Sequence, residues 1–337
     1  MRRAHAWSVS SRFPHARPEQ VDPPPSGAAA NTARPQRGRH PYKEGDFTVA
    51  NTSRAVLVTG CSSGIGHATA DLLARAGWPV YATARRADSM KDLAAHGAKL
   101  LTLDVTDEDS MRAAVDNVES DHGAVGVLIN NAGYSQSGAV EEVPMDNVRA
   151  QFETNVFGLI SLTQMVLPGM RRHGWGRVVN MSSVGGRLTF PGAGIYHASK
   201  HAVEAISDAL RFEVRRFGID VIVVEPGLVR TTSGKQATEA RDETQDDEIA
   251  QEGPYANFHK AIGQATVEAY EKGVLARRGG TPAQVAQLIR HAIATDKPKS
   301  RYRVDRTARV LMTQRRLLPD RAWDRFLQSR FPRPGER

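Results

Sequence analysis

The chain has 337 residues, of which 40% are hydrophobic and 24% charged, so it can bury a substantial core. Its net charge of +8 would suit a nucleic-acid-binding protein, but residues 1–54 carry +5 and residues 297–337 carry +9, which leaves −6 for residues 55–296. No nucleic-acid-binding motif accompanies the basic ends, so we expect no specific nucleic-acid partner.

Cysteine content and hydropathy indicate the cellular compartment in which we expect the protein. The one cysteine, Cys61, has no partner for an intrachain disulfide, which fits a reducing compartment, and we expect a cytoplasmic protein. We interpret Cys61 as a small core residue rather than as a nucleophile. The most apolar stretch, residues 156–170, is interrupted by Ser161, Thr163 and Gln164, so we expect no transmembrane segment.

Residues 1–52 differ in composition from the rest of the chain. They are rich in Pro, Arg, Ser and Ala and show neither helical nor strand periodicity, which predicts a disordered leader. Four arginines and no acidic residue occur within the first eighteen positions, so an organelle transit peptide stays as the alternative.

From Arg54 onward, short β-branched runs alternate with longer segments of helical spacing. We expect strands at residues 55–58, 80–83, 99–103, 125–129, 177–181, 219–224 and 302–304. We expect helices at residues 65–76, 88–96, 107–122, 145–172, 194–217, 256–272, 281–294 and 321–328. Apolar strands without polar alternation, separated by helices, indicate a parallel sheet covered on both faces. The sequence predicts a single doubly wound α/β domain of the Rossmann type over residues 53–305, with about seven mainly parallel strands.

Two segments fall outside this alternation. Residues 231–275 begin with a long polar stretch that includes an acidic run, and a segment of this length inside a compact domain predicts a substrate lid. Residues 306–337 form a basic C-terminal extension. Between them, Thr281 and Pro282 are suited to the N-cap and first turn of a helix.

A glycine cluster follows the first expected strand. Gly60, Gly64 and Gly66 allow a tight turn, and the helix after them offers free N–H groups and a favourable dipole to a pyrophosphate. Such glycines also occur in ordinary turns, but their place between the first strand and helix of a βαβ unit favours dinucleotide binding.

A tyrosine and a lysine stand four positions apart in the expected helix 194–217. Residues with this spacing share one helix face, so Tyr196 and Lys200 can address one ligand. A phenol has a pKa near 10, and a nearby ammonium lowers it by favouring the phenolate. This pairing also arises by chance, but Ser183 and its neighbour Ser182 follow the strand 177–181 at the sheet edge where ligands bind.

Together these motifs resemble the short-chain dehydrogenase/reductase family. The resemblance covers residues 54 to about 230 in the family's order and spacing and rests on Gly60-x-x-x-Gly64-x-Gly66, Asn130-Asn131-Ala132-Gly133, Ser183, Tyr196-x-x-x-Lys200 and Pro226-Gly227. Residues 80–85 and 184–195 look like the hydroxysteroid and retinol dehydrogenase branch. The resemblance implies an NAD(P)-dependent oxidoreductase that acts on a lipophilic ketone, aldehyde or secondary alcohol.

The resemblance also implies a role for each catalytic residue. Tyr196 transfers the proton, while Lys200 tunes it and binds the nicotinamide ribose. Ser183, selected over Ser182 by the family's spacing, holds the substrate oxygen. Asn155 matches an asparagine that holds a water between Lys200 and solvent, with a satisfied helix kink as the alternative.

For the cofactor, the resemblance implies contacts from Gly60, Ser62, Ser63, Gly64, Ile65, Gly66, Arg85, Asp104, Val105, Asn131, Ala132, Gly133, Tyr196, Lys200, Pro226, Gly227, Val229 and Thr231. Arg85 stands where an acid would bind an unphosphorylated ribose, so we expect NADP(H) in preference to NAD(H), unless Arg85 belongs to a solvated turn. The glycine loop lacks the basic residue of many NADP-using relatives. Asp104 would contact the adenine or, alternatively, cap the next helix.

Other functions and assemblies stay open at this stage. A catalytically silent NADP-binding regulator would keep the fold without turnover, and the basic ends could bind nucleic acid nonspecifically. His197 and His201 are spaced like metal ligands but lack an obvious third ligand, so we expect no metal. The resemblance implies a homodimer or homotetramer that packs through helices 145–172 and 194–217.

Overall fold

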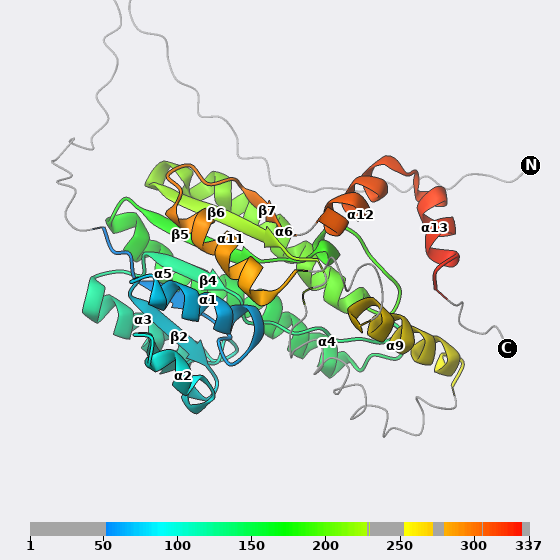
Figure 1. Cartoon of the computed structure of the whole chain (residues 1–337), viewed down its shortest axis with the longest axis horizontal. Coiled ribbons are helices and arrows are strands. Elements are labelled where there is room, and N and C mark those ends of the chain that lie inside the picture. Colours follow the sequence, from blue (N-terminus) through cyan, green and yellow to red (C-terminus); the bar gives the residue numbers. More distant parts are fainter. Residues whose placement is uncertain (1–51, 228, 230–252, 272–279, 305, 332–337) are drawn as a thin grey trace, which may run out of the picture. The chain divides into compact units, whose positions relative to one another are not determined.

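The structure is a computed structural model, and it describes residues 52–227, 229, 253–271, 280–304 and 306–331 (Figure 1). All of them fall in the compact unit that begins at Thr48. The expected leader, apart from Thr52, lies outside the described residues, as do residues 231–252 and 272–275 of the expected lid region and residues 332–337 of the extension.

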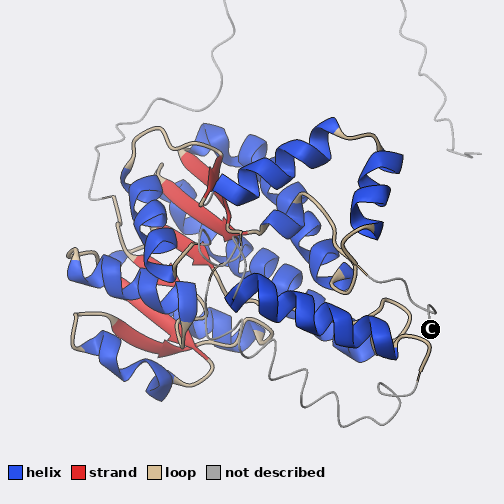
Figure 2. Cartoon of the chain, turned by 45° about the vertical axis from the view of Figure 1, so that its right-hand side comes forward, coloured by secondary structure: helices blue, strands red, loops and turns tan. Residues whose placement is uncertain are grey.

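Within the described part of the chain, seven strands form one sheet in the order β3-β2-β1-β4-β5-β6-β7 (Figure 2). Every strand pairing in it is parallel. The strands are β1 Val56–Val58, β2 Val80–Ala84, β3 Lys99–Thr102, β4 Val127–Asn130, β5 Gly176–Met181, β6 Ile219–Glu225 and β7 Arg301–Arg303. The strand order reverses between β1 and β4, which is the switch point where Rossmann folds bind ligands. The predicted fold class is confirmed.

Helices cover both faces of the sheet. Across the described residues the helices are α1 Gly64–Arg75, α2 Lys91–Ala94, α3 Glu108–His122, α4 Met145–Phe152, α5 Gly158–Arg172, α6 Gly194–Val214, α9 Ala256–Glu271, α11 Pro282–Ala294, α12 Arg306–Leu317 and α13 Asp320–Gln328, of which α9, α12 and α13 lie beyond the sheet. Neighbouring residues of a strand point to opposite faces, and β1 divides accordingly. Val58 joins the core cluster that includes α1 and α11, whereas Leu57 joins the cluster that includes α3 and α5.

Some local structure differs from the expected elements. The helix expected at residues 88–96 is a 3₁₀ turn, Ala87–Met90, followed by the short α2. The helix expected at residues 145–172 contains a π-helical turn, Glu153–Phe157, between α4 and α5. The sequence analysis missed α12, whose Met312 is buried against Leu188 through tertiary packing that its own spacing did not indicate.

Two further expectations can be compared with the described residues. Thr281 accepts a hydrogen bond from Gln284 N, and the Gln284 side chain in turn accepts from Thr281 N, so the predicted start of α11 is a capping box. Across the described residues, no helix combines the length and the apolar character needed to span a bilayer.

Candidate active site

The loop between β1 and α1 has a backbone path that requires glycine. Gly60 and Gly64 have φ angles of +71° and +61°, in the left-handed region that residues with a Cβ rarely adopt. At Gly66 the limit is space, because an added Cβ would overlap the carbonyl oxygen of Gly60 and Nδ2 of Asn131. The loop therefore folds closely on itself and on the end of β4.

Thr59 and Asn131 join the ends of β1 and β4. The Thr59 hydroxyl accepts hydrogen bonds from the backbone N–H groups of Asn131 and Ala132, at 3.0 and 2.9 Å. Asn131 Nδ2 donates to the carbonyl oxygens of Thr59 and Gly60, at 2.8 and 3.1 Å. The sequence analysis placed Asn131 against the cofactor but missed Thr59, whose signal was a polar residue at the end of an apolar strand.

The start of α1 fits a pyrophosphate. Ser63 occupies the N-cap but makes no side-chain capping hydrogen bond, and the first turn contains no acidic residue. The first N–H groups of a helix without a side-chain cap offer donors and a positive dipole end to an anion. Beside this turn, Ser62 is exposed and Ile65 is half-buried. The close packing at Gly66 and the uncapped helix start together fit a dinucleotide phosphate group.

The expected cofactor-specificity residues lie at the ends of β2 and β3. Arg85 follows β2, is exposed, and makes no ion pair with any described residue. Asp104 Oδ1 accepts hydrogen bonds from Thr106 N and Oγ1, at 2.9 and 2.8 Å. Asp107 caps α3 by accepting from the backbone amides of its first turn, so the alternative of Asp104 as the helix cap is wrong.

Tyr196 and Lys200 lie on the first turns of α6. The Lys200 Nζ atom lies 5.9 Å from the centre of the Tyr196 ring and donates a 2.8 Å hydrogen bond to the carbonyl oxygen of Met181. Lys200 is only 6% exposed, and burial lowers the pKa of its ammonium to about 8. An ammonium is thus held beside the phenol at the end of β5.

Ser183 approaches the same place from β5. Its Oγ accepts a 3.1 Å hydrogen bond from the N–H of Gly185, and a Cβ added at Gly185 would lie 3.4 Å from Cε1 of Tyr196. Ser182 is 4% exposed, and a Cβ added at Gly186 would lie 2.6 Å from its Oγ. Ser183 is the less buried of the two serines, and Gly185, which donates to its Oγ, lies next to the Tyr196 ring.

Asn155 occupies the π-helical turn between α4 and α5 and is 1% exposed. Its Nδ2 donates to the Tyr134 carbonyl at 2.9 Å and to Ser199 Oγ at 3.0 Å, while its Oδ1 accepts from Tyr134 N at 3.1 Å. The side chain therefore connects the segment after β4 to α6. A Cβ added at Gly133 would lie 2.8 Å from Asn155 Oδ1 and 3.6 Å from Lys200 Nζ, so these groups meet at one point.

A buried polar chain fixes the ends of β4 and β5. Asn130 Nδ2 donates to Asn180 Oδ1 at 2.9 Å and to Thr163 Oγ1 at 3.0 Å, and Asn180 Nδ2 donates to Ser207 Oγ at 2.9 Å. The sequence analysis quoted Asn130 as part of a motif but gave Asn180 no role. A polar residue in a strand expected to be buried on both faces was the available signal.

The remaining expected cofactor contacts border the same edge of the sheet. Val184 N donates a 2.9 Å hydrogen bond to the Pro226 carbonyl, which brings the segment Pro226-Gly227 next to Ser183. Val229 is 6% exposed and pairs with Gly280 in an isolated bridge. Val105 is buried against Gly158, whose added Cβ would overlap its carbonyl oxygen. Thr231 lies outside the described residues.

The two histidines near the site have partners within the protein. Nδ1 of His197 accepts a 3.3 Å hydrogen bond from Phe190 N, and burial lowers the pKa of His197 to about 4, which keeps its ring neutral. Nδ1 of His201 lies 2.9 Å from the His197 carbonyl oxygen. Among the described residues, no group of three His, Cys, Asp or Glu side chains could hold a metal ion.

Comparison with known proteins identifies similar chains. The family model described as short chain dehydrogenase matches residues 54–242. The uncharacterized oxidoreductase YbbO of Escherichia coli is 38% identical over 82% of this chain and 94% of its own length. The NADPH-dependent 3-dehydrocapnine reductase of Ornithobacterium rhinotracheale is 32% identical over 81% and 95% of the two chains, and bovine 17-beta-hydroxysteroid dehydrogenase type 6 is 33% identical over 83% and 90%.

A solved structure agrees with these matches. The crystal structure of a short-chain dehydrogenase from Streptomyces avermitilis is 36% identical, covers 78% of this chain and 92% of its own, and superposes with a TM-score of 0.66. The family model spans the segment from the glycine loop to the end of β6.

Proposed function

Since the chain belongs to the short-chain dehydrogenase family and is an oxidoreductase, we propose that it transfers hydride between NADP(H) and a lipophilic ketone, aldehyde or secondary alcohol. The observation that carries this proposal is the meeting of Ser183, Tyr196 and Lys200 at the end of β5, with Lys200 Nζ 5.9 Å from the tyrosine ring. The proposed nucleotide loop lies at the end of β1 in the same parallel sheet.

The proposed proton donor in the reducing direction is the Tyr196 hydroxyl. Tyr196 would donate its hydroxyl proton to the carbonyl oxygen, and a bound nicotinamide would supply the hydride that the carbonyl carbon needs to become an alcohol. The ammonium of Lys200 stabilises the phenolate that is left behind. Because its pKa is about 8, Lys200 stays largely charged at neutral pH despite its burial.

Ser183 and Asn155 support this step in different ways. The hydroxyl of Ser183 is proposed to donate a hydrogen bond to the substrate oxygen, where negative charge develops. Asn155 is proposed to act by positioning, because its side chain ties Tyr134 to Ser199, and Ser199 Oγ donates a 2.7 Å hydrogen bond to the carbonyl of Tyr196.

The proposed substrate is apolar around its reacting carbon. The segment 184–195 links Ser183 to Tyr196, and its polar side chains are only Arg187 and Thr189. A relative named for a steroid substrate supports this class.

The proposed preference for NADP(H) rests on Arg85. A guanidinium without an ion-pair partner among the described residues, placed directly after β2, is suited to a 2′-phosphate. The NADPH-dependent relative supports the same preference. We expect kcat/KM to be higher for NADPH than for NADH and the difference to shrink in Arg85→Ala. A wild-type preference for NADH would contradict the proposal.

The decisive experiment is the substitution Tyr196→Phe. We expect turnover to fall by about three orders of magnitude, the size of a general acid–base contribution, while the Kd for NADPH stays close to wild type. Activity is followed by nicotinamide absorbance with a panel of ketones, aldehydes, steroids and retinoids. Tyr302→Phe, on β7, serves as the matched control and should retain activity.

The same assay separates the proposed enzyme from a silent cofactor-binding regulator. A wild-type protein that binds NADPH but turns over none of the panel would favour the regulator. Substantial turnover in Tyr196→Phe would instead show that the proton comes from another group.

We also propose a homodimer or homotetramer. Phe157, at the start of α5, is 51% exposed, and Phe212, on α6, is 87% exposed, so the two helices expected at the interface carry large apolar side chains in solvent. Light scattering should give a molar mass at a multiple of 36.8 kDa, and a monomer would contradict the proposal.

A further inference from the structure

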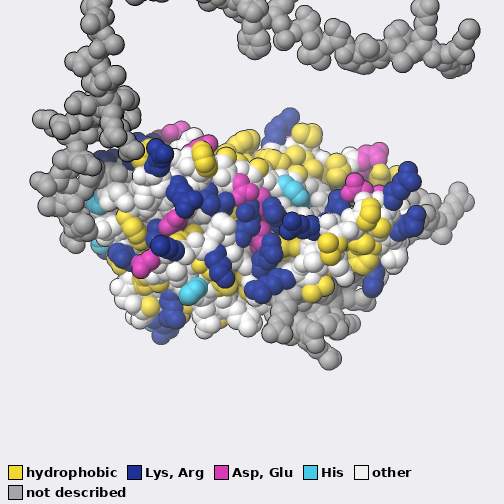
Figure 3. Space-filling model, turned by 90° about the horizontal axis from the view of Figure 1, so that it is seen from above, with side chains coloured by type: hydrophobic (Ala, Val, Ile, Leu, Met, Phe, Trp, Pro, Cys, Tyr) yellow, Lys and Arg dark blue, Asp and Glu magenta, His cyan; other side chains and the backbone are white. Residues whose placement is uncertain are grey.

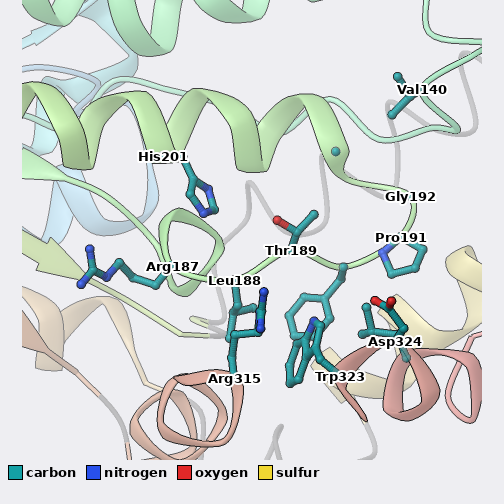
Figure 4. A pocket seen from close by; sticks show the side chains of 13 residues that line it. Val140, Arg187, Leu188, Thr189, Pro191, Gly192, His201, Arg315, Trp323 and Asp324 are labelled. Carbon is teal, nitrogen blue, oxygen red and sulfur yellow. The ribbon is translucent and has the colours of Figure 1, made fainter. Parts of the chain in front are cut away.

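A hollow of about 480 Å³ lies between the segment after β5 and the C-terminal helices. Its floor is formed by Leu188 and Phe190 from that segment and by Trp323 and Leu327 from α13. Leu188 and Trp323 are 2% and 4% exposed, so the apolar side chains face inward. Figure 4 shows Trp323 beneath the segment that carries Thr189, with Arg315 near Leu188.

A second hollow, of about 460 Å³, adjoins the first. The two share Arg187 and Arg315, and the second is also lined by Arg303, Met312 and Arg316. Its described lining therefore contains four arginines and no acidic residue. Seen from above, Lys and Arg side chains lie beside apolar and acidic ones on the face drawn in Figure 3.

Acidic side chains neutralise this arginine cluster only in part. Arg303 pairs closely with the fully buried Glu225, at 2.8 Å, but Arg187 reaches the same carboxylate only at 3.7 Å. Arg315 pairs with Asp320, which is 84% exposed, and such a pair is weak in water. Arg316 makes no ion pair with any described residue. The cluster keeps a positive charge that an anion could neutralise.

We propose that the two hollows form one binding site for a single-chain amphiphile with a phosphate-type anionic head. The head lies among Arg187, Arg315 and Arg316, because guanidinium groups bind phosphate oxygens in a bidentate manner. The chain lies against Phe190, Pro191 and Leu327, which line the first hollow and are only half-buried, so that about 25 cal/mol is gained per Å² of apolar surface buried. The described lining contains none of Ser183, Tyr196 and Lys200, so this site is distinct from the catalytic one.

The apolar surface favours a single bound molecule over a bilayer. Phe190 and Leu327, which line the first hollow, are half-buried, whereas insertion into a membrane surface requires apolar side chains that protrude. Val310 and Leu317 on α12 do protrude, at 54% and 76% exposed, which makes an anionic bilayer the competing occupant. The experiment below separates the two.

The bound chain would touch the segment that connects two catalytic residues. The Phe190 ring lies 6.4 Å from the ring of Trp323 and 6.0 Å from that of His197, the residue next to Tyr196. Occupancy of the hollow is thereby linked to the catalytic helix through one aromatic side chain. The test nevertheless measures binding alone, so it does not depend on the proposed reaction.

Trp323 provides the reporter for the test. Full-length protein is titrated with dodecyl phosphate below its micelle concentration, and tryptophan fluorescence and heat of binding are both recorded. We expect a saturable fluorescence change that is lost in Trp323→Phe, while the heat of binding persists there. Arg316→Gln should weaken binding about tenfold, as expected for one charge-assisted contact, whereas Arg321→Gln, an exposed arginine on α13 outside both hollows, should not.

Three results would overturn the proposal. Inorganic phosphate that binds as tightly as dodecyl phosphate would show that the apolar hollow contributes nothing, and equal binding of dodecyl maltoside would show the same for the arginines. Binding only to phosphatidylglycerol vesicles, weakened equally by Arg316→Gln and Arg321→Gln, would identify a membrane surface instead. Melting temperatures of the variants confirm that each is folded.

Discussion

The centre of the sheet and its edge at β7 are held together by different interactions. At β1, β4 and β5, short neutral side chains such as Thr59 and Asn131 bond to nearby backbone, and glycines allow chains to approach closely. At β6 and β7, long charged side chains form a network in which Arg301 contacts Glu204 at 2.9 Å and Glu225 at 3.3 Å. The first region depends on close packing and the second on paired charges. We therefore expect added volume to disrupt the first region and a removed charge to disrupt the second.

The largest effect is expected from a substitution at Gly66, where the nucleotide loop leaves no space for a side chain. In Gly66→Ala the new Cβ overlaps backbone of the nucleotide loop, so the loop must move. We expect the Kd for NADPH to rise at least about 100-fold, which corresponds to about 2.7 kcal/mol, as measured by cofactor fluorescence.

Gly77→Ala is the matched control. Gly77 has a φ of +80° but nothing within 4 Å of an added Cβ, so the substitution strains the backbone without a clash. It should lower stability by about 1–2 kcal/mol and leave NADPH binding unchanged. Normal NADPH binding by Gly66→Ala would contradict the view that fit governs this region.

The next effect concerns charge balance at Glu225. Its side chain is fully buried and pairs with Arg303 at 2.8 Å. Glu225→Gln preserves the shape but removes the charge that pairs with Arg303 and Arg301, which are 38% and 20% exposed, so we expect a cost of about 1.5–3 kcal/mol, the size of hydrogen bonds to a charged group. We expect a large fall in the free energy of unfolding, measured with urea, and a much smaller change in NADPH affinity.

An exposed ion pair tests whether burial is the cause. Asp146, whose side chain is 94% exposed, pairs with Arg149 at 2.8 Å, and Asp146→Asn should leave stability unchanged. Equal losses of unfolding free energy in Asp146→Asn and Glu225→Gln would show that burial of the charge does not determine how much an ion pair stabilises this protein.

The same contrast explains what the sequence could predict. The fold class, the strand positions and the glycine loop follow from local patterns, because β-branched runs and left-handed glycines leave a signal within a few residues. The π-helical turn at Asn155 left no such signal, since it depends on contacts with Tyr134 and Ser199. For the same reason α12 was missed.

The partners in the charge network are equally hidden in the sequence. Glu225 and Arg303 are 78 positions apart and meet because β6 pairs in parallel with β7, whereas Glu204 on α6 and Arg301 on β7 are 97 positions apart and meet through tertiary packing. The positions of Ser183, Tyr196 and Lys200 could be predicted because the family resemblance specifies the spacing of these residues in the sequence. Their catalytic roles stay predictions until Tyr196→Phe is measured.

The smallest expected effect concerns Lys200, whose charged side chain is buried within the closely packed region. Burial lowers its pKa from 10.5 to about 8, so above pH 8 the unfolded chain binds more protons than the folded one at this site. Stability from this residue must then rise with pH between about 8 and 10.5, while below pH 8 the folded protein carries the full cost of a buried ammonium.

Lys200→Met removes that cost. We expect the variant to be more stable than wild type at pH 7, by at most about 3 kcal/mol less the lost hydrogen bond to Met181, and the advantage to shrink as the pH rises through 8. Urea unfolding at several pH values between 7 and 9.5 measures it, and Lys91→Met, at an exposed lysine, should show no such trend. A constant difference would mean that Lys200 is not destabilised by burial, and that the proposed site keeps its ammonium charged without a cost in stability.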